Sequence, residues 1–158
     1  MHTLLLLRHA KSDWSTPVSD HKRPLNKRGI RDAPMMAKRL KKHGYRPDRM
    51  LSSSAQRARA TAELFAKTLR SKLVLVDALY DADKNTIIDL IRQTDEGIKD
   101  LMLVGHNPAW EILVENLTGE DMVMPTCSTV QIAFDCHWKE IKEGGGEIVY
   151  FDYPKKKI

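Results

Sequence analysis

The sequence predicts a three-layer α/β/α fold with a mostly parallel, open sheet and helices on both of its faces. Four short apolar runs are continuous rather than alternating, as expected for strands that are covered on both faces. Helical patterns separate these runs, and a helix between two strands is the usual crossover of a parallel sheet. The order β-α-β-α-β-α-β-α-β-β therefore indicates an α/β protein with two strands added at the end.

The strands are predicted from apolar runs bounded by turn residues. The four runs of the parallel part cover residues 3–7, 49–52, 73–76 and 101–104. Two later runs, 130–134 and 148–153, look like sheet-edge strands. The glycine-rich turn at residues 143–147 lies between them and indicates an antiparallel hairpin.

Four segments have helical periodicity, namely 26–43, 55–69, 86–94 and a segment that begins at Pro108 or Ala109. The apolar stripe of each helix is expected to face the core. Three stripes can be read: Ile30, Ala33, Ala37 and Leu40; Ala58, Ala62, Phe65 and Leu69; and Trp110, Leu113, Val114 and Leu117. Gly44 suits the end of the first helix, and Pro34 should kink that helix or split it in two.

The size and composition favour one globular domain, residues 1–158, in a reducing compartment. A chain of 158 residues suits a single domain. The two cysteines, Cys127 and Cys136, are too few for a disulfide framework or a cysteine-rich zinc site, so we expect the cytoplasm. The run at residues 4–7 is too short for a signal peptide, and no stretch approaches the roughly 20 apolar residues of a membrane span.

The net charge of +5 permits an anionic partner. Part of it comes from Lys155, Lys156 and Lys157 in a basic tail, residues 154–158. We favour a solvated tail over attraction to nucleic acid or to an acidic protein.

Arg8 and His9 directly follow the first apolar run. The carboxyl end of a strand is where ligands bind in open α/β sheets. His9 could act there as a nucleophile, with Arg8 holding an anion beside it. Because neighbouring side chains of a strand diverge, the two converge only if the chain turns at the small Ala10. The alternative is a structural pair at a strand end.

Arg57 lies in the first turn of a predicted helix that directly follows a strand. Ser53 and Gln56 match a capping box, with Ser54 as a competing N-cap. A helix N-terminus favours an anion, so a cation there makes sense if Arg57 faces a phosphate. The alternative is a surface arginine, which is what we expect of Arg59.

His106 is displayed in the same way, after the fourth apolar run. Gly105 before it allows backbone or ligand to come close. Pro108 suits the first position of a new helix, so His106 should lie beside a helix N-terminus. The alternative is a turn residue with a satisfied hydrogen bond.

Together these segments describe a pocket for a dianion, with two arginines, two histidines and one imidazole able to attack. No acidic cluster accompanies them, and two histidines without a third ligand do not suit zinc, so we expect no metal. A phosphate loop of the form GxxxxGK(S/T) is absent from the sequence, which excludes nucleotide hydrolysis by that route.

Four ordered elements between residues 3 and 134 resemble the histidine phosphatase superfamily, also called phosphoglycerate mutase-like. LLLLRHAKSDW resembles its Arg-His-Gly motif, with Ala10 in place of the glycine, and RPLNKRG (residues 23–29) resembles the element that follows. SSSAQRARATAE and LVGHNPAWE resemble the elements that carry the second arginine and the second histidine. The small size, the Lys-Ser-Asp-Trp sequence and the Gly-His-Asn-Pro form are similar to SixA-type phosphohistidine phosphatases.

The resemblance implies a cofactor-independent hydrolase with defined roles. His9 would be phosphorylated, Arg8 and Arg57 would grip the phosphoryl oxygens, and a cationic His106 would stabilise the transferring charge. Like-charge repulsion from the guanidinium groups should keep His9 neutral, and an acceptor should fix its other nitrogen. Water would then cleave the intermediate.

The substrate implied is phosphohistidine on a partner protein. Superfamily members that act on phosphate esters use a carboxylic acid to protonate the leaving oxygen, and Asp81 is the candidate here. SixA-type members lack that acid. They do not need it, because the P–N bond of phosphohistidine is intrinsically labile. Lys11, Ser12 and Asp13 are candidates for binding substrate at the pocket mouth, and Trp14 is expected to pack.

Two other functions remain open from the sequence. One is a small-molecule phosphomonoesterase of the same superfamily, which would need a working acid at Asp81 or Asp83. The other is a catalytically idle phosphate or nucleic-acid binder, for which the basic tail is the best support.

Overall fold

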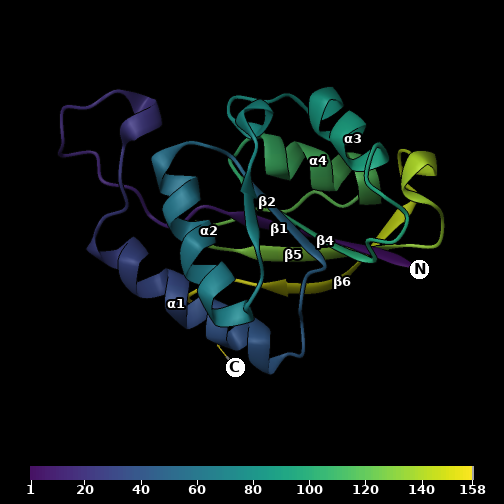
Figure 1. Ribbon diagram of the computed structural model, residues 1–158, viewed down its shortest axis with the longest axis horizontal. Coiled ribbons are helices and arrows are strands. Elements are labelled where there is room, and N and C mark those ends of the chain that lie inside the picture. Colours follow the sequence, from purple (N-terminus) through teal and green to yellow (C-terminus); the bar gives the residue numbers. More distant parts are fainter. Residues whose placement is uncertain (158) are drawn as a thin grey trace.

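The computed structural model describes residues 1–157, which form one six-stranded sheet between two layers of helices (Figure 1). The strands are β1 His2–Arg8, β2 Arg49–Ser52, β3 Leu73–Leu75, β4 Asp100–Gly105, β5 Thr129–Phe134 and β6 Gly146–Asp152. The α-helices are α1 Lys27–Lys42, α2 Gln56–Leu69, α3 Lys84–Arg92 and α4 Ala109–Thr118. Three short 3-10 helices complete the described chain: η1 Asp20–Lys22, η2 Asp77–Leu79 and η3 Trp138–Glu140.

The sheet has the strand order β3-β2-β4-β1-β5-β6, with β1 inside it. The strands β3, β2, β4 and β1 pair in parallel, whereas β5 is antiparallel to β1 and β6 is antiparallel to β5. The predicted α/β/α class, the mostly parallel sheet and the terminal antiparallel pair are confirmed.

Two expectations about the sheet edges are wrong. The strand β5 is not at an edge, because it pairs with β1 on one side and with β6 on the other. The strand β3 is an edge and is not covered on both faces: Val74 is 45% exposed and Leu75 is 40% exposed. A three-residue strand with a single neighbour has too little of the sheet around it to be buried.

The leucine run of β1 is continuous because it supplies both cores. Leu5 and Leu7 pack on the side of α1 and α2, and Leu4 and Leu6 pack on the side of α3 and α4. All four are fully buried. Burying one such side chain contributes roughly 1.5–3 kcal/mol, so this strand anchors both layers.

The helix α1 starts and ends as predicted but presents a different face. The Asn26 side chain accepts a hydrogen bond from the backbone N–H of Gly29 at 2.9 Å, and Gly44 follows the helix at φ +93°. Ile30 is 57% exposed, so its expected burial is wrong, because Gly29 is the residue that faces inward in the first turn. Pro34 does not split the helix, since buried residues on both sides of it hold the two halves against the core.

The start of α2 differs from the predicted capping box. Its N-cap is Ala55, and no side chain caps the helix. The Ser53 hydroxyl instead accepts from the Ala55 N–H at 3.2 Å and bonds to His106, which removes it from the capping position. The predicted apolar stripes of α2 and α4 are confirmed, and α3 begins two residues earlier than expected, with Asp83 as its N-cap.

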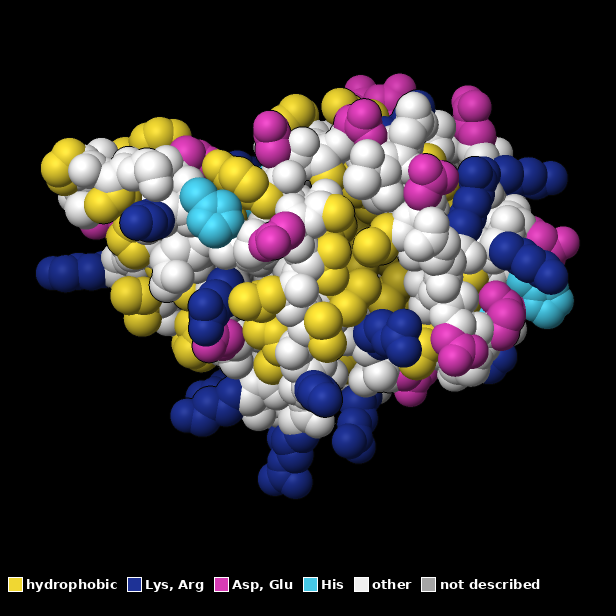
Figure 2. All heavy atoms as spheres, turned by 45° about the horizontal axis from the view of Figure 1, so that its top comes forward, with side chains coloured by type: hydrophobic (Ala, Val, Ile, Leu, Met, Phe, Trp, Pro, Cys, Tyr) yellow, Lys and Arg dark blue, Asp and Glu magenta, His cyan; other side chains and the backbone are white. Residues whose placement is uncertain are grey.

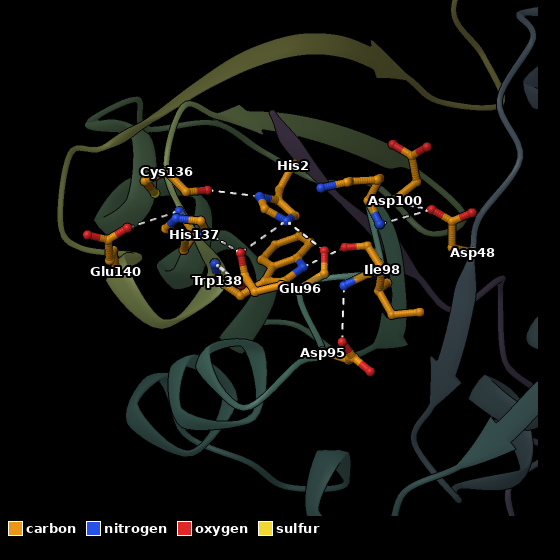
Figure 3. A network of polar contacts seen from close by, with 12 residues as sticks. His2, Asp48, Asp95, Glu96, Ile98, Asp100, Cys136, His137, Trp138 and Glu140 are labelled. Carbon is orange, nitrogen blue, oxygen red and sulfur yellow. Dashed lines mark hydrogen bonds and ion pairs between the residues drawn. The ribbon is translucent and has the colours of Figure 1, made fainter.

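A polar network fastens the amino end of the sheet, opposite the end where the candidate motifs lie. Figure 3 shows Glu96 between His2 and His137, with Trp138 beneath them. The His2 ring donates from Nδ1 to the Cys136 carbonyl at 2.8 Å, and Glu96 accepts from the Trp138 N–H at 2.8 Å and from His137. These bonds tie the first residue of β1 to the connection between β5 and β6.

The surface is mixed in character. Figure 2 shows hydrophobic side chains gathered near the middle of one face, with acidic side chains above them and lysines and arginines projecting mainly from the lower and lateral edges. The basic tail is exposed at Lys155, Lys156 and Lys157. Within it, the Lys156 ammonium group donates to the Phe151 carbonyl at 2.7 Å. The last residue of the tail lies outside the described residues. None of the helices formed by residues 1–157 has the length and apolar character of a membrane span.

Candidate active site

The adjacent carboxyl ends of β1 and β4 bring His9 and His106 together. Arg8 pairs with Gly105 across the two parallel strands, and the His9 N–H donates to the Gly105 carbonyl at 3.0 Å. The two imidazole centroids lie 5.3 Å apart, with the rings tilted by 54°. The structure therefore places both histidines side by side at the carboxyl ends of two inner strands.

The strand β1 ends at Arg8, and the chain that follows it is held at Ala10. The Ala10 N–H donates to the Thr61 hydroxyl at 3.0 Å, and that hydroxyl donates to the Arg57 carbonyl at 2.7 Å. Ala10 is fully buried. The turn that carries His9 is thus fastened to the first turns of α2, which carry Arg57.

Close packing against the backbone of Lys11 requires a glycine at position 29, the last residue of the segment RPLNKRG. A Cβ on Gly29 would lie 2.2 Å from the backbone oxygen of Lys11, so no other residue fits there without a backbone shift. The same Lys11 oxygen accepts from the Asn26 N–H at 3.0 Å. The start of α1 therefore holds the loop that follows His9.

Gly105 is required by the packing beneath His106. A Cβ on Gly105 would lie 2.5 Å from the indole ring of Trp110. That indole is fully buried and donates from Nε1 to the Leu7 carbonyl at 3.0 Å. The ring thereby connects the two strands that carry the histidines.

His9 is a neutral imidazole with one nitrogen fixed. It is 7% exposed, and burial lowers its pKa to about 3, with smaller contributions from the charges of His106, Arg57 and Arg8. Burial, rather than the expected like-charge repulsion, is therefore the main cause. The Nδ1–H donates to the Ala10 carbonyl at 2.8 Å, which leaves the lone pair on Nε2.

The surroundings of His106 favour the neutral imidazole in this structure, whereas the expected cationic role concerns the charge of a transferring phosphoryl group. Burial, followed by the charge of Arg57, lowers its pKa to about 4, and Asp20 acts in the opposite direction. Its Nε2 is hydrogen-bonded to the Ser53 hydroxyl at 2.8 Å. Its Nδ1 has no partner among the described residues.

The two arginines are held by backbone and side-chain acceptors. Arg57 is 6% exposed and donates to the Asp20 carbonyl at 2.8 Å and to the Asp20 carboxylate at 3.1 Å. Arg8 donates from Nη1 to the Met124 carbonyl at 2.8 Å. Each arginine keeps a buried Nε–H without a partner within residues 1–157.

Buried polar atoms are nearly always hydrogen-bonded, and the exceptions need an explanation. Four such exceptions lie at the carboxyl end of β1, in the first turn of α2 and directly after β4: Arg8 Nε, Arg57 Nε, His106 Nδ1 and Asn107 Oδ1. Three of the four can donate a hydrogen bond, so they suit an anionic ligand.

A cleft of about 560 Å³ opens beside His106 and Arg57. Its lining includes Tyr80, Asp81 and Asp83 from the segment between β3 and α3. Asp81, the candidate acid, lies at φ +55°, a left-handed conformation that aspartate tolerates better than most residues.

Of the predicted site residues, Arg57, His106 and Asp81 line this cleft, whereas Arg8 and His9 lie outside its lining, as do Lys11, Ser12 and Asp13. Ser12 is 6% exposed and its hydroxyl accepts from Arg23, while Asp13 accepts from the Ser15 N–H at 2.8 Å. Trp14 is 74% exposed, so its expected packing role is wrong; the Arg23 guanidinium lies 3.6 Å from the centroid of its ring.

The sequence missed several residues that the fold adds to this site, namely Asp20, Arg23, Ser53 as a partner of His106, and Tyr80. Arg23 opens the segment RPLNKRG, but nothing in that segment indicates that its guanidinium binds Asp20. No pattern marks Asp20 or Tyr80, because Asp20 contacts Arg57 and Tyr80 across 37 and 60 residues of the chain. Among the described residues, no group of three or more histidine, cysteine, aspartate or glutamate side chains could hold a metal ion.

Comparison with known proteins places these features in a family. The model of the histidine phosphatase superfamily (branch 1) matches residues 4–96. The uncharacterised protein Rv1276c of Mycobacterium tuberculosis is 30% identical over 94% of this chain and 100% of its own length.

Solved structures of histidine phosphatases have the same fold as this chain. The SixA protein of Agrobacterium tumefaciens, to which phosphohistidine phosphatase activity is attributed, is 31% identical with a TM-score of 0.84, covering 97% of this chain and 98% of that one. The protein histidine phosphatase SixA in complex with tungstate, at 24% identity and a TM-score of 0.84 over 96% and 97% of the two chains, shares the fold. The chain thus has the phosphoglycerate mutase-like fold and belongs to the histidine phosphatase superfamily, branch 1.

Proposed function

We propose that this protein is a phosphohistidine phosphatase that acts on partner proteins through a phosphohistidine intermediate on His9. The observation that carries the proposal is the state of His9: neutral, with Nδ1 tied to the Ala10 carbonyl and Nε2 available beside two arginines. The attribution of this activity to the SixA relative at 31% identity supports the substrate class.

In the first step, the lone pair of His9 Nε2 attacks the phosphorus atom and the P–N bond to the substrate imidazole breaks. The electron pair of that bond stays on the substrate nitrogen, which takes up a proton from solvent. In the second step, water attacks the phosphorus and the bond to His9 breaks, with its electron pair returning to Nε2. Inorganic phosphate leaves with the oxygen of that water, and the hydrogens of the water stay on phosphate or pass to solvent. Phosphoryl transfer through a loose transition state depends mainly on positioning and charge stabilisation.

Arg8 and Arg57 supply that stabilisation in the proposed mechanism. Their unpartnered Nε–H groups are the donors for the phosphoryl oxygens. A bound dianion raises the pKa of a neighbouring imidazole, so His106 becomes protonated as the phosphoryl group binds and then donates to it. The route uses side chains alone, without a metal or a cofactor.

The cleft beside His106 gives the substrate access. Its volume of about 560 Å³ and its position next to Arg57 suit a side chain presented by another protein.

We propose that residues 1–158 act as a single catalytic domain in the cytoplasm, where the free thiols of Cys127 and Cys136 stay reduced.

The test is to trap phosphate on His9. Wild type, His9→Ala and a control, His43→Ala at the exposed end of α1, are mixed with a ³²P-labelled phosphohistidine carrier protein and quenched. We expect acid-labile label on wild type and on the control, and neither label nor turnover with His9→Ala. Failure to label wild type, together with unchanged turnover by His9→Ala, would contradict the proposal.

A second candidate is a small-molecule phosphomonoesterase, favoured by the position of Asp81 and Asp83 in the lining of the same cleft. Either carboxyl group could protonate a leaving oxygen. Asp81→Asn suits the test because asparagine also tolerates the left-handed backbone. If wild type prefers a phosphate ester, and Asp81→Asn or Asp83→Asn loses most of that activity, this function replaces the first.

A further inference from the structure

The Asp20 carboxylate lies at the centre of a group of donors beside the site. Its Oδ1 accepts from Arg23 at 2.9 Å, and its Oδ2 accepts from Arg57 at 3.1 Å and from the Tyr80 hydroxyl at 2.7 Å. Its backbone carbonyl also accepts from Arg57, at 2.8 Å. Hydrogen bonds from Arg23 and Tyr80, with the charge of Arg57, hold the pKa of Asp20 well below its usual range, so it remains an anion and not a proton donor.

These contacts orient the guanidinium of Arg57. Its Nη1 and Nη2 bond to the carbonyl and the carboxylate of one residue, Asp20. Since a guanidinium group is planar and its donors form a rigid fork, fixing both terminal nitrogens fixes the direction of the Nε–H. That Nε–H is the buried donor without a partner, so Asp20 determines where it points.

The same carboxylate also holds one wall of the cleft. Tyr80, whose hydroxyl donates to Asp20, stands edge-on to His106 with centroids 5.8 Å apart and edge-on to His21 at 4.7 Å. Asp20 therefore connects the arginine on one side of the site with the aromatic wall on the other.

A permanent negative charge in a cationic site opposes the binding of a free anion. Two arginines and an imidazole would retain inorganic phosphate, the product of the proposed reaction, and a carboxylate on one arginine reduces that attraction. The location of Asp20 makes sense if alignment of Arg57 matters more than affinity for the anion.

We propose that Asp20 is a positioning residue, which aligns Arg57 with the transferring phosphoryl group and at the same time weakens the hold on free phosphate. The proposal rests on the proposed function for the identity of the transferred group. It distinguishes Asp20 from a structural residue, because loss of its charge should strengthen anion binding while slowing turnover.

The test compares wild type, Asp20→Asn and Glu63→Gln. Glu63 is an exposed partner of Arg59 on α2, so its substitution removes one negative charge from the helix that carries Arg57 without touching the site. Calorimetric titration with tungstate is expected to give roughly tenfold tighter binding to Asp20→Asn, with a matching fall in the inhibition constant of inorganic phosphate. The kcat for phosphohistidine should fall about tenfold, and Glu63→Gln should match wild type.

The outcomes separate the two proposals. Unchanged or weaker tungstate binding by folded Asp20→Asn overturns the role of Asp20, and so does an unchanged kcat. If wild type does not hydrolyse phosphohistidine, the proposed function fails, and the tungstate titration alone decides on Asp20.

A crystal of wild type with tungstate keeps the proposal testable if Asp20→Asn does not fold. Retention of both Asp20–Arg57 bonds, with Arg57 Nε on the oxyanion, is the expected result. Movement of Arg57 away from Asp20 to grip the oxyanion by its terminal nitrogens would overturn it.

Discussion

The imidazole rings of His9 and His106 lie 5.3 Å apart between centroids and are tilted by 54°, at the ends of two adjacent parallel strands. They are held differently. His9 is fixed through Nδ1 by a backbone carbonyl, whereas His106 is bonded through Nε2 to a hydroxyl and keeps a free Nδ1. This asymmetry suits a division of roles in which one ring attacks and the other adjusts its protonation to the bound anion.

Activity should persist in acid to a pH well below the usual pKa of histidine. Because burial lowers the pKa of His9 to about 3, its lone pair stays available from pH 8 to pH 5. We expect kcat/KM for phosphohistidine to show no loss near pH 6.5 that arises from His9. A pH profile with a His9-dependent acid limb at that value would contradict the assignment.

Stability should respond to acid in the opposite way. A histidine with a pKa of 6.5 when unfolded and about 3 when folded binds protons more readily in the unfolded state. The contribution of His9 to the free energy of unfolding is therefore fully present above pH 6.5 and is lost progressively as the pH falls below that value. His9→Asn cannot be protonated and can still donate to the Ala10 carbonyl, so its Tm should decline less between pH 7 and pH 5 than that of wild type. His43→Asn serves as the control, and parallel curves for wild type and His9→Asn would refute the linkage.

Arg57→Lys should lose activity although it keeps the charge. Lysine cannot bond to both acceptors of Asp20 and also present a fixed N–H to a phosphoryl oxygen. We expect kcat/KM to fall about 100-fold, which is typical of losing one transition-state donor. Arg59→Lys, two residues further along and paired with Glu63 in solvent, should behave like wild type in the same assay.

Gly105→Ala should disturb the floor of the site. Its Cβ would lie 2.5 Å from the Trp110 indole and would push that ring away from the Leu7 carbonyl. Overpacking of this kind destabilises a protein by about 1–3 kcal/mol, and we expect both a lower Tm and slower turnover. Gly97→Ala is the control, since its nearest neighbour would lie at 3.6 Å, an ordinary contact. Equal unfolding curves for the two variants would show that Trp110 can move freely.

Ser53→Ala should act on His106 rather than on the helix. The hydroxyl bonds to His106 Nε2 at 2.8 Å and does not serve as the N-cap of α2. Without it both ring nitrogens lack a protein partner, the ring orientation loosens, and kcat should fall by roughly an order of magnitude. NMR of the His106 ring should detect the change, while circular dichroism of the helices should not. A variant with normal kcat but a frayed α2 would restore the capping role.

The sequence alone determined the parts of this protein that depend on local pattern. Residue spacing along a few turns or strand residues predicts the order of strands and helices, the two-sided burial of Leu4 to Leu7 and the stripes of α2 and α4. It also predicts Arg8, His9 and His106 at strand ends and Arg57 in the first turn of a helix. These features identified the fold class and four residues of the candidate site, because periodicity decides which face of an element is buried.

The tertiary structure alone decided what depends on contacts between distant segments. The neutrality of His9 and His106 arises from burial beneath several elements, and the Ser53 hydroxyl was drawn from a capping role by a histidine on another strand. Asp20 acquired its place because η1 folds back over α2 and the edge of the cleft. Solvent exclusion and charge proximity are properties of the packed chain, and no window of sequence contains them.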